Sequence, residues 1–370
     1  MNEMELLYAM ALTRIPTIGT HWALVLYKAA GSAVALYEAH REIKSILPEA
    51  SPKMQEILLD YPKYVEMVKP ELDFMERFRI KGLVYGNNAY PCRLMECVDA
   101  PLVLFQQGDA DLNARHIISM IGTRRCTEYG RDMCRSFLRD LSKVDPSILV
   151  VSGLAYGIDA NAHEQALANG LPTVGVLAHG LDRIYPQANR RLAEQMLAHK
   201  GGLLTEYFTK TEPDAFNFVQ RNRIVAGMSD CCIVVESDEK GGSLITADLA
   251  MGYNRDVFAF PGRCTDRFSK GCNKLIERNS AALLTDVHSF MEQMRWGTKV
   301  PTVIEKELFI ELSPDEERVV AALKQADELQ INVLAVQCNL PIAKLSALLL
   351  GLEMKGMVKA LVGGTYRLLS

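Results

Sequence analysis

The sequence predicts an α/β protein whose core is a doubly wound parallel sheet, with a helical domain before it and another small domain after it. Between residues 115 and 295, apolar runs of four to six residues alternate with stretches whose apolar residues recur at helical spacing. The runs lack polar alternation, so each strand is expected to be buried on both faces by covering helices. The length of 370 residues favours two to three domains.

The elements of the core, placed at residues 80–295, follow from this alternation. Residues 80–108 form a bridge with two short strand-like runs, Leu83–Gly86 and Pro101–Phe105. The expected strands beyond it are Ile117–Ile121, Ile148–Val151, Thr173–Leu177, Leu203–Thr205, Cys232–Val235, Val257–Phe260 and Ala281–Leu284. The expected helices are Arg131–Leu141, Ala160–Ala168, Arg191–Leu197 and Leu244–Tyr253.

The first 75 residues are expected to be helical, because apolar residues recur at helical spacing and β-branched runs are absent. Between the first two helices, Ile15–Gly19 is a tight hairpin that ends in a glycine suited to a chain reversal. It resembles the hairpin of helix-hairpin-helix modules, whose backbone N–H groups hold a phosphate, although Thr17 stands where such hairpins have a first glycine. DNA contact and simple packing both remain open for this hairpin.

The C-terminal part is expected to be a winged helix. Residues 296–312 read as a linker, and a domain follows at residues 313–370. Ser313-Pro314-Asp315-Glu316 is a strong helix start, with an N-cap, a proline at the first position and acids in the first turn. Two further helical stretches precede a hairpin around Gly363-Gly364.

Charge and composition exclude several classes of protein. The net charge is −4, and residues 110–290 hold 21 basic and 21 acidic residues, so any nucleic-acid site must be a local patch. The nine cysteines show no CxxC spacing, which argues against a structural zinc site and favours reduced thiols in the cytoplasm. The N-terminus lacks a signal peptide's basic region, and no apolar run reaches 18 residues, so no membrane span is expected.

Glycine-rich turns after successive strands are the main candidates for a binding site. Gly122-Thr123-Arg124, Ser152-Gly153 and Gly242-Ser243 each follow a predicted strand or open a helix, where backbone N–H groups hold anions. A polar glycine turn is also expected at residues 269–274. Turns after parallel strands share one edge of the sheet, so they should converge there. The G-x-G-x-x-G and Walker A patterns are absent, and no nucleotide cofactor is implied.

The stretch Phe216–Arg223 combines aromatic and basic residues. Phe218 could stack on an unpaired base while Arg221 and Arg223, which flank Asn222, hold the backbone. The alternative is a buried Phe218 beside a salt-bridged arginine pair. The sequence contains no G-x-S-x-G elbow or HExxH motif that would indicate catalysis.

An ordered set of motifs resembles the DNA-processing protein A (DprA/Smf) family. The motifs are Tyr90-Pro91, Gly122-Thr123-Arg124, Ser152–Asp159, Ala162-His163, Gly180-Leu181-Asp182, Tyr185-Pro186, Glu206-Tyr207, Arg221-Asn222-Arg223, Gly242–Ala247 and Pro261-Gly262. The resemblance covers nearly the whole chain and implies a SAM-like helical domain at 1–75, a Rossmann-like DNA-binding core and a C-terminal winged helix.

The resemblance also implies a function and a site. It implies a cytoplasmic, non-enzymatic protein that binds single-stranded DNA, helps load the RecA recombinase in natural transformation and recombination, and forms a homodimer through the Rossmann-like core. No cofactor or metal is implied. The residues carried over as DNA-binding are Gly122, Thr123, Arg124, Ser152, Gly153, Phe218, Arg221, Asn222, Arg223, Gly242 and Ser243.

The sequence departs from some relatives, which place a basic residue near Asp214 or Gln187; Lys210, Arg190 and Arg191 are the nearby substitutes. Two other functions are alternatives. The core also resembles nucleotide phosphoribohydrolases, which need acids on the helix after the Gly-Gly turn, where this chain has only Asp248. A winged-helix transcription regulator is disfavoured because residues 313–370 carry six basic and six acidic residues.

Overall fold

The computed structural model describes residues 3–296, 312–326, 328–361 and 363–369. The chain divides into two compact units, residues 1–298 and residues 299–370. The linker expected at residues 296–312 lies outside the described residues except for its first and last residue.

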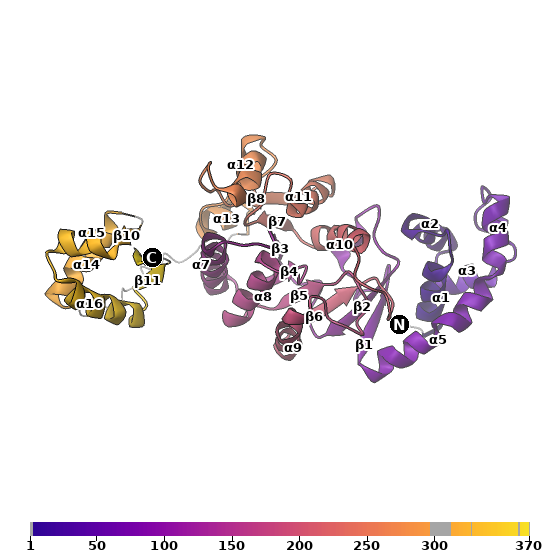
Figure 1. Ribbon diagram of the computed structural model, residues 1–370. Helices are drawn as coiled ribbons and strands as arrows, with labels where there is room; N and C mark the ends of the chain where they lie inside the picture. Colours follow the sequence, from indigo (N-terminus) through magenta and orange to yellow (C-terminus); the bar gives the residue numbers. More distant parts are fainter. Residues whose placement is uncertain (1–2, 297–311, 327, 362, 370) are drawn as a thin grey trace. The chain divides into compact units, whose positions relative to one another are not determined.

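A nine-stranded sheet forms the core of the first unit, counted over the described residues (Figure 1). Its strands, in spatial order, are β1 (Ile80–Val84), β2 (Val103–Gly108), β6 (Gly202–Thr205), β5 (Thr173–Val176), β4 (Leu149–Ser152), β3 (Ile117–Ile121), β7 (Cys231–Val234), β8 (Asp256–Ala259) and β9 (Ala282–Leu283). From β6 to β9 all neighbours are parallel, whereas β1 and β2 form an antiparallel edge. The predicted α/β class is confirmed.

The chain order of the strands creates a switch point at β3. The chain adds β4, β5 and β6 on one side of β3, then returns to place β7 on its other side. In open sheets of this kind, ligands bind beyond the carboxyl ends of the strands near such a reversal. The loops that follow β3, β4 and β7 therefore lie where a ligand is expected, in agreement with the glycine pattern.

Strand residues point alternately to the two faces of the sheet. Helices cover both faces because the residues on each face are apolar. In β3, Ile117 and Ile121 join one buried cluster and Ile118 and Met120 join another. The first face carries α6 (Cys92–Met95), α10 (Ala215–Gly227), α11 (Gly242–Gly252) and α12 (Lys270–Glu277). The second carries α7 (Glu128–Val144), α8 (Ile158–Ala168) and α13 (Val287–Gln293), with α9 (Arg190–Ala198) beside α8.

One expected turn is wrong. Residues 270–274 form the first part of α12 rather than an open glycine turn, and Gly271 lies in the first turn of that helix. A Cβ on Gly271 would lie 2.6 Å from the carbonyl oxygen of Asp238, so this glycine allows the helix to pack closely on the loop after β7.

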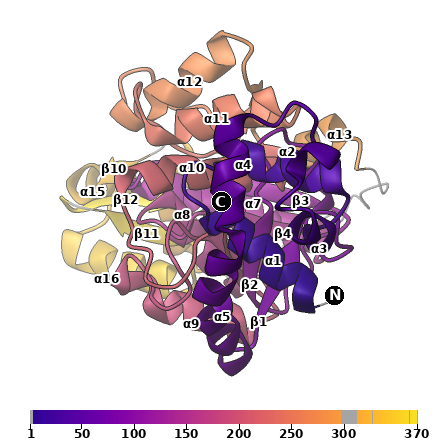
Figure 2. The same ribbon diagram turned by 90° about the vertical axis from the view of Figure 1, so that its right-hand side faces the viewer.

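The N-terminal segment is helical, as predicted. Its helices are α1 (Glu3–Arg14), α2 (Thr20–Ala30), α3 (Ala33–Glu38), α4 (Pro52–Leu59) and α5 (Tyr61–Arg77). They share one apolar cluster with residues of β1 and β2, and Figure 2 shows α1 and α5 against that edge of the sheet. A Cβ on Gly82 of β1 would lie 2.5 Å from a methyl group of Leu6, so the helical segment is packed tightly on the sheet.

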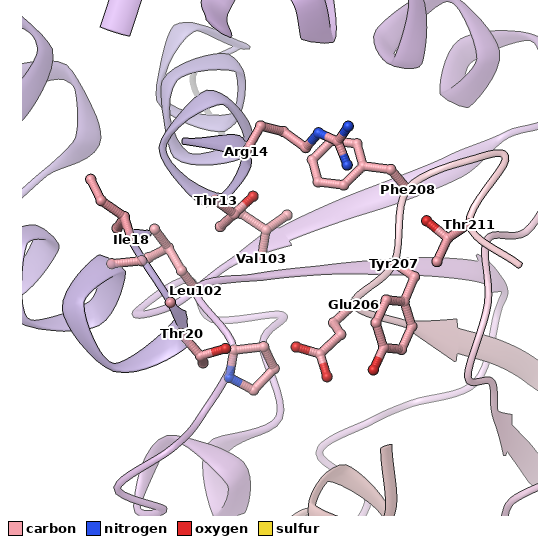
Figure 3. Close-up of a pocket in the computed structure, with 13 residues that line it drawn as sticks. Thr13, Arg14, Ile18, Thr20, Leu102, Val103, Glu206, Tyr207, Phe208 and Thr211 are labelled. Carbon is pink, nitrogen blue, oxygen red and sulfur yellow. The ribbon is translucent and has the colours of Figure 1, made fainter. Parts of the chain in front are cut away.

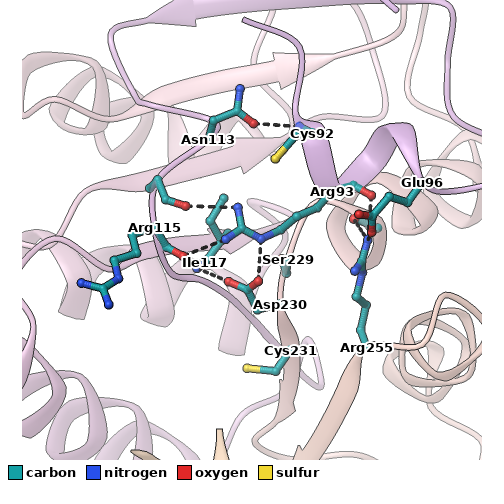
Figure 4. A network of polar contacts seen from close by, with 12 residues as sticks. Cys92, Arg93, Glu96, Asn113, Arg115, Ile117, Ser229, Asp230, Cys231 and Arg255 are labelled. Atoms are coloured by element: carbon teal, nitrogen blue, oxygen red, sulfur yellow. Dashed lines mark hydrogen bonds and ion pairs between the residues drawn. The ribbon is translucent and has the colours of Figure 1, made fainter. Parts of the chain in front are cut away.

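A polar network fastens the 85–115 segment to the amino ends of β3 and β7 (Figure 4). The guanidinium of Arg93 donates to Asp230 at 2.6 Å and to the carbonyl oxygens of Ala114 and Arg115. The second carboxylate oxygen of Asp230 accepts from the N–H of Ile117 at 2.8 Å. This network lies at the edge of the sheet opposite the glycine loops, and its role is structural.

The second unit forms a compact helical domain closed by a small sheet. Helix α14 (Pro314–Lys324) begins with a capping box in which Ser313 and Glu316 satisfy each other's backbone N–H groups. The other elements are β10 (Leu329–Gln330), α15 (Ile331–Cys338), α16 (Ile342–Met354), β11 (Val358–Leu361) and β12 (Thr365–Leu368), with β12 central in the sheet. Of the helices described, none alone has the length and apolarity to cross a bilayer. Helices α15 and α16 reach that length and apolarity only when taken together, and a bend of 106° separates them.

Candidate nucleic-acid interface

The loops after β3 and β4 interlock at the carboxyl edge of the sheet. A Cβ on Gly122 would lie 2.5 Å from Ile158, and one on Gly157 would lie 2.3 Å from the carbonyl oxygen of Thr123. Gly157 also has a φ of +79°, a conformation that favours glycine. The N–H of Ile158 donates to the carbonyl oxygen of Thr123 at 3.1 Å. The glycines are therefore required for two loops to meet, and this meeting places Arg124 on the surface.

The amino end of α7 is occupied by a carboxylate of the protein itself. Glu236, which follows β7 and is 2% exposed, accepts from the N–H of Thr127 at 2.9 Å and from its hydroxyl at 2.5 Å. A phosphate at this helix end, where the sequence led us to expect one, would meet a buried negative charge. The side chain of Arg124, rather than the amino end of α7, is thus the group available to a phosphate.

Arg124 and two aromatic rings form an exposed group at this edge. The guanidinium carbon of Arg124 lies 5.0 Å from the centre of the Phe218 ring, in cation–π geometry. Phe218 is half-buried, belongs to none of the core clusters, and lies 5.8 Å from the ring of Tyr185, which is 46% exposed. Arg124 has no ion pair among the described residues. A cation beside accessible aromatic rings is the arrangement that binds unpaired bases and their phosphates.

Arg221 lies beneath the glycine loop rather than on the surface. It is 3% exposed, and its Nη1 donates to the carbonyl oxygens of Gly153 and Val176. A Cβ on Gly153 would lie 2.3 Å from that nitrogen, so this glycine makes room for the guanidinium. Burial raises the pKa of the nearby carboxyl of Asp159, and the positive charge of Arg221 opposes that shift. Arg221 thus ties together the loops after β4 and β5.

Arg223 points to a different part of the molecule. It is 4% exposed, and its Nη2 donates to Glu206 at 2.5 Å while Nη1 donates to the carbonyl oxygen of Asp99. The sequence left open the alternative of a buried Phe218 beside salt-bridged arginines. Arg223 is such a salt-bridged arginine. The same alternative does not describe Phe218, whose ring is only half-buried.

The remaining predicted site residues divide into buried hydroxyls and accessible groups. The hydroxyl of Ser152 donates to the carbonyl oxygen of Met120 at 2.6 Å, and that of Ser243 donates to Ser237 at 2.8 Å. Gly242 is exposed, and a Cβ there would meet no atom within 4 Å. Asn222 is half-buried. Of the set, Arg124, Phe218 and Gly242 present the clearest accessible groups.

Sequence reasoning missed two residues of this interface. Tyr185 stands in the Tyr185-Pro186 motif but received no role, and Glu236 was not recognised as the acceptor for Thr127, the N-cap of α7. The departure at Asp214 has a local explanation, because its carboxylate caps α10 by accepting from the N–H of Asn217 at 2.7 Å. His163, of the Ala162-His163 motif, is buried and hydrogen-bonded to the hydroxyl of Thr173 at 2.6 Å.

The comparison with known families decides the identity of the chain. Residues 81–295 match the family model of DNA recombination-mediator protein A. The chain belongs to the DprA/Smf family. Residues 309–364 match the DprA winged helix domain, which confirms the winged helix expected at this end.

Individual relatives of the DprA/Smf family agree over most of the chain. The protein Smf of Escherichia coli is 34% identical over 319 residues, which are 84% of this chain and 83% of that protein. The crystal structure of DprA from Streptococcus pneumoniae matches with a TM-score of 0.66 and 30% identity, covering 78% of this chain and 97% of that one. A DprA structure from Helicobacter pylori, described for its single-stranded DNA binding mode, matches with a TM-score of 0.53 and 32% identity, covering 59% of this chain and 97% of that one.

Proposed function

We propose that this protein binds single-stranded DNA at the carboxyl edge of its sheet and mediates recombination without catalysing a reaction. The observation that carries the proposal is the exposed group formed by Arg124, Phe218 and Tyr185, with a cation 5.0 Å from one ring and two rings 5.8 Å apart. Stacking accepts any unpaired base but excludes paired ones, whose faces are already covered. The single-stranded DNA binding of the Helicobacter pylori relative supports the same ligand class.

We propose no catalysis because the site lacks the carboxylates that such a reaction would need. A phosphoribohydrolase-like reaction would require carboxylates on α11 facing the loops, and Asp248 is the single acid on that helix. Asp248 instead lines a surface hollow with Glu96, Tyr253 and Arg255. Glu236 is already engaged at the amino end of α7.

The wider role proposed from the family follows from this binding. We propose that the protein protects incoming single strands, delivers them to the RecA recombinase in natural transformation and recombination, and acts as a cytoplasmic homodimer through its Rossmann-like core. The partnership with RecA is tested by co-elution with RecA on a single-stranded oligonucleotide. The homodimer is tested by the molecular mass in solution, which should be twice 41.2 kDa.

A salt titration tests the DNA site itself. Affinity is measured by fluorescence anisotropy for single-stranded and duplex oligonucleotides of equal length, with the wild-type protein and with Arg124→Ala. We expect a strong preference for the single strand and, in Arg124→Ala, a slope of log affinity against log salt that is flatter by about 0.7, the value of one phosphate contact.

A matched control and a contrary outcome complete the test. Arg139→Ala removes an equally charged side chain near the far end of α7, where it pairs with Asp140, and should leave DNA binding unchanged. Equal affinity of the wild-type protein for duplex and single strand would refute the proposed function. A salt slope unaltered by Arg124→Ala would remove Arg124 from the site.

A further inference from the structure

The loop between β4 and α8 carries an exposed aromatic side chain, that of Tyr156. Tyr156 is 50% exposed, and it is the only exposed residue between Ile148 and His163, a stretch that the structure describes throughout. Leu154, two residues before it, is fully buried in an apolar cluster that includes residues of α9. The loop therefore turns one apolar side chain inward and leaves a larger one in solvent.

The side chain of Tyr156 is available to a ligand. Its hydroxyl has no hydrogen-bond partner, and its ring has no aromatic or cationic neighbour, among the described residues. Two other tyrosines of the core differ in this respect. The hydroxyl of Tyr129 donates to the carbonyl oxygen of Pro261. That of Tyr207 donates to the carbonyl oxygen of Asn217 at 3.4 Å, and Tyr207 lines a cavity of about 260 Å³ (Figure 3).

The backbone beside Tyr156 is held firmly, although its side chain is not. Nδ2 of Asn189 donates to the carbonyl oxygens of Leu154 and Ala155 at 2.9 and 3.3 Å. The carboxylate of Asp159 accepts from the N–H of Ala155 at 3.4 Å. Asn189 and Asp159 are both less than one-tenth exposed, so buried polar groups fix the loop. A ring carried on a fixed backbone loses little freedom when a ligand binds, which favours stacking.

The same contacts fasten this loop to the two segments that carry the exposed rings of the proposed DNA site. Asn189, which bonds the loop, follows Tyr185 within one short segment. Arg221, which donates to the carbonyl oxygen of Gly153 in the loop, lies one turn after Phe218 on α10. The loop and both rings are therefore parts of one rigid assembly.

The loop also touches the backbone of Arg124. A Cβ on Gly157 would lie 2.8 Å from the Cα atom of Arg124. Because Gly157 directly follows Tyr156, the exposed tyrosine and the proposed phosphate-binding arginine lie at neighbouring points of the surface. Proteins that bind single strands combine cationic groups along the backbone with aromatic rings on which successive bases stack. Tyr156 has the position and the exposure of such a ring.

We propose that the ring of Tyr156 stacks on an unpaired base of its own, next to the phosphate held by Arg124 and separate from the base held by Phe218. This inference rests on the proposed single-strand binding and adds a second stacking position to that site. The rings of Tyr156 and Phe218 make no contact with each other, so each has a face for a different base. The position accepts any base, because every base has a π face.

Two substitutions of Tyr156 separate the ring from the hydroxyl. Affinity of the full-length protein for a single-stranded oligonucleotide is measured by fluorescence anisotropy over a range of salt. Tyr156→Ala should bind about 5- to 150-fold more weakly, the value of one stacked base, with the salt slope unchanged. Tyr156→Phe should bind as the wild type does, because the ring remains. Both variants should melt as the wild type does, since the side chain is exposed.

A control and a double variant make the outcome decisive. Phe78→Ala removes a ring of similar exposure, 44%, at the end of α5, and should leave the affinity unchanged. In the double variant of Tyr156→Ala and Phe218→Ala, the two losses should multiply, because each ring holds a different base.

Three results would overturn the inference. They are wild-type affinity in Tyr156→Ala, an equal loss in Tyr156→Phe and Tyr156→Ala, and a double variant that binds no more weakly than Phe218→Ala alone. Failure of the wild-type protein to bind any single strand would instead refute the proposed function.

Discussion

Replacing Arg221 with alanine is the sharpest test of how this site is built. The sequence groups Arg221 with Arg124 as DNA-binding, whereas the structure buries it at 3% exposure beneath the loop after β4. The change would leave the carbonyl oxygens of Gly153 and Val176 without a donor and Asp159 without its nearby positive charge. Removing one partner from a buried charged cluster costs about 3–5 kcal/mol in the free energy of unfolding.

The assay measures stability and DNA binding separately. A loss of about 3–5 kcal/mol should lower the melting temperature of a domain of this size by on the order of 10 °C. Below that transition, the affinity for single strands should fall only to the extent that the loops lose their arrangement, and the salt slope should stay that of the wild type. Arg124→Ala should behave in the opposite way, with an unchanged melting temperature and a flatter slope.

A conservative variant separates charge from geometry. Lysine keeps the charge but, as a single ammonium on a flexible stem, cannot reproduce the rigid fork of a guanidinium. We therefore expect Arg221→Lys to be destabilised as well, though less than Arg221→Ala. An Arg221→Ala protein that melts normally and shows the flattened salt slope would refute this reasoning and return Arg221 to the phosphate site.

Three other predictions follow from the same geometry. Phe218→Ala should lose about 1–3 kcal/mol of single-strand affinity, the value of one stacked base, with the salt slope unchanged and the melting temperature within a few degrees; a collapse of the melting temperature would make Phe218 a core residue. Ending the chain at residue 298 should leave single-strand affinity within about tenfold, or 1.4 kcal/mol, since residues 299–370 form a compact unit of their own and residues 313–370 carry six basic and six acidic residues. Trp296 is kept because its ring stacks on that of His116, with 4.2 Å between the ring centres. Burial lowers the pKa of His163 to about 3, below its usual 6.5, so the unfolded chain binds the proton more readily than the folded one. The stability of the folded protein should therefore fall as the pH drops from about 6.5 toward 3. In His163→Gln, thermal melts between about pH 7 and 5 should show a weaker dependence of the melting temperature on pH.

Much of the architecture was determined by the sequence alone. Apolar runs without polar alternation can be buried only between two layers of helices, so β3 to β8 and the helices between them, except α10, were predicted close to their observed bounds. The glycines at 122, 153 and 242 indicated an edge where backbone groups come close, because carboxyl ends of parallel strands share one edge. The position of the candidate site was therefore predictable.

The roles of individual side chains at that edge were decided by the tertiary structure. Arg221 and Arg223 look equivalent in sequence, yet residues two apart on a helix point about 200° apart, so one reaches the loops after β4 and β5 and the other reaches Glu206. Whether each arginine side chain is buried depends on which part of the molecule it reaches. The packing of α10 on the sheet decides this.

The same reason explains the other differences. Glu236 accepts from Thr127 at the amino end of α7 only because β7 lies beside β3, a contact between segments more than one hundred residues apart in the chain. Gly271 packs in a helix rather than a turn because the loop after β7 lies against it. Sequence periodicity records whether a position is buried, which is a local property, but the partner of a polar group is set by the three-dimensional order of the strands.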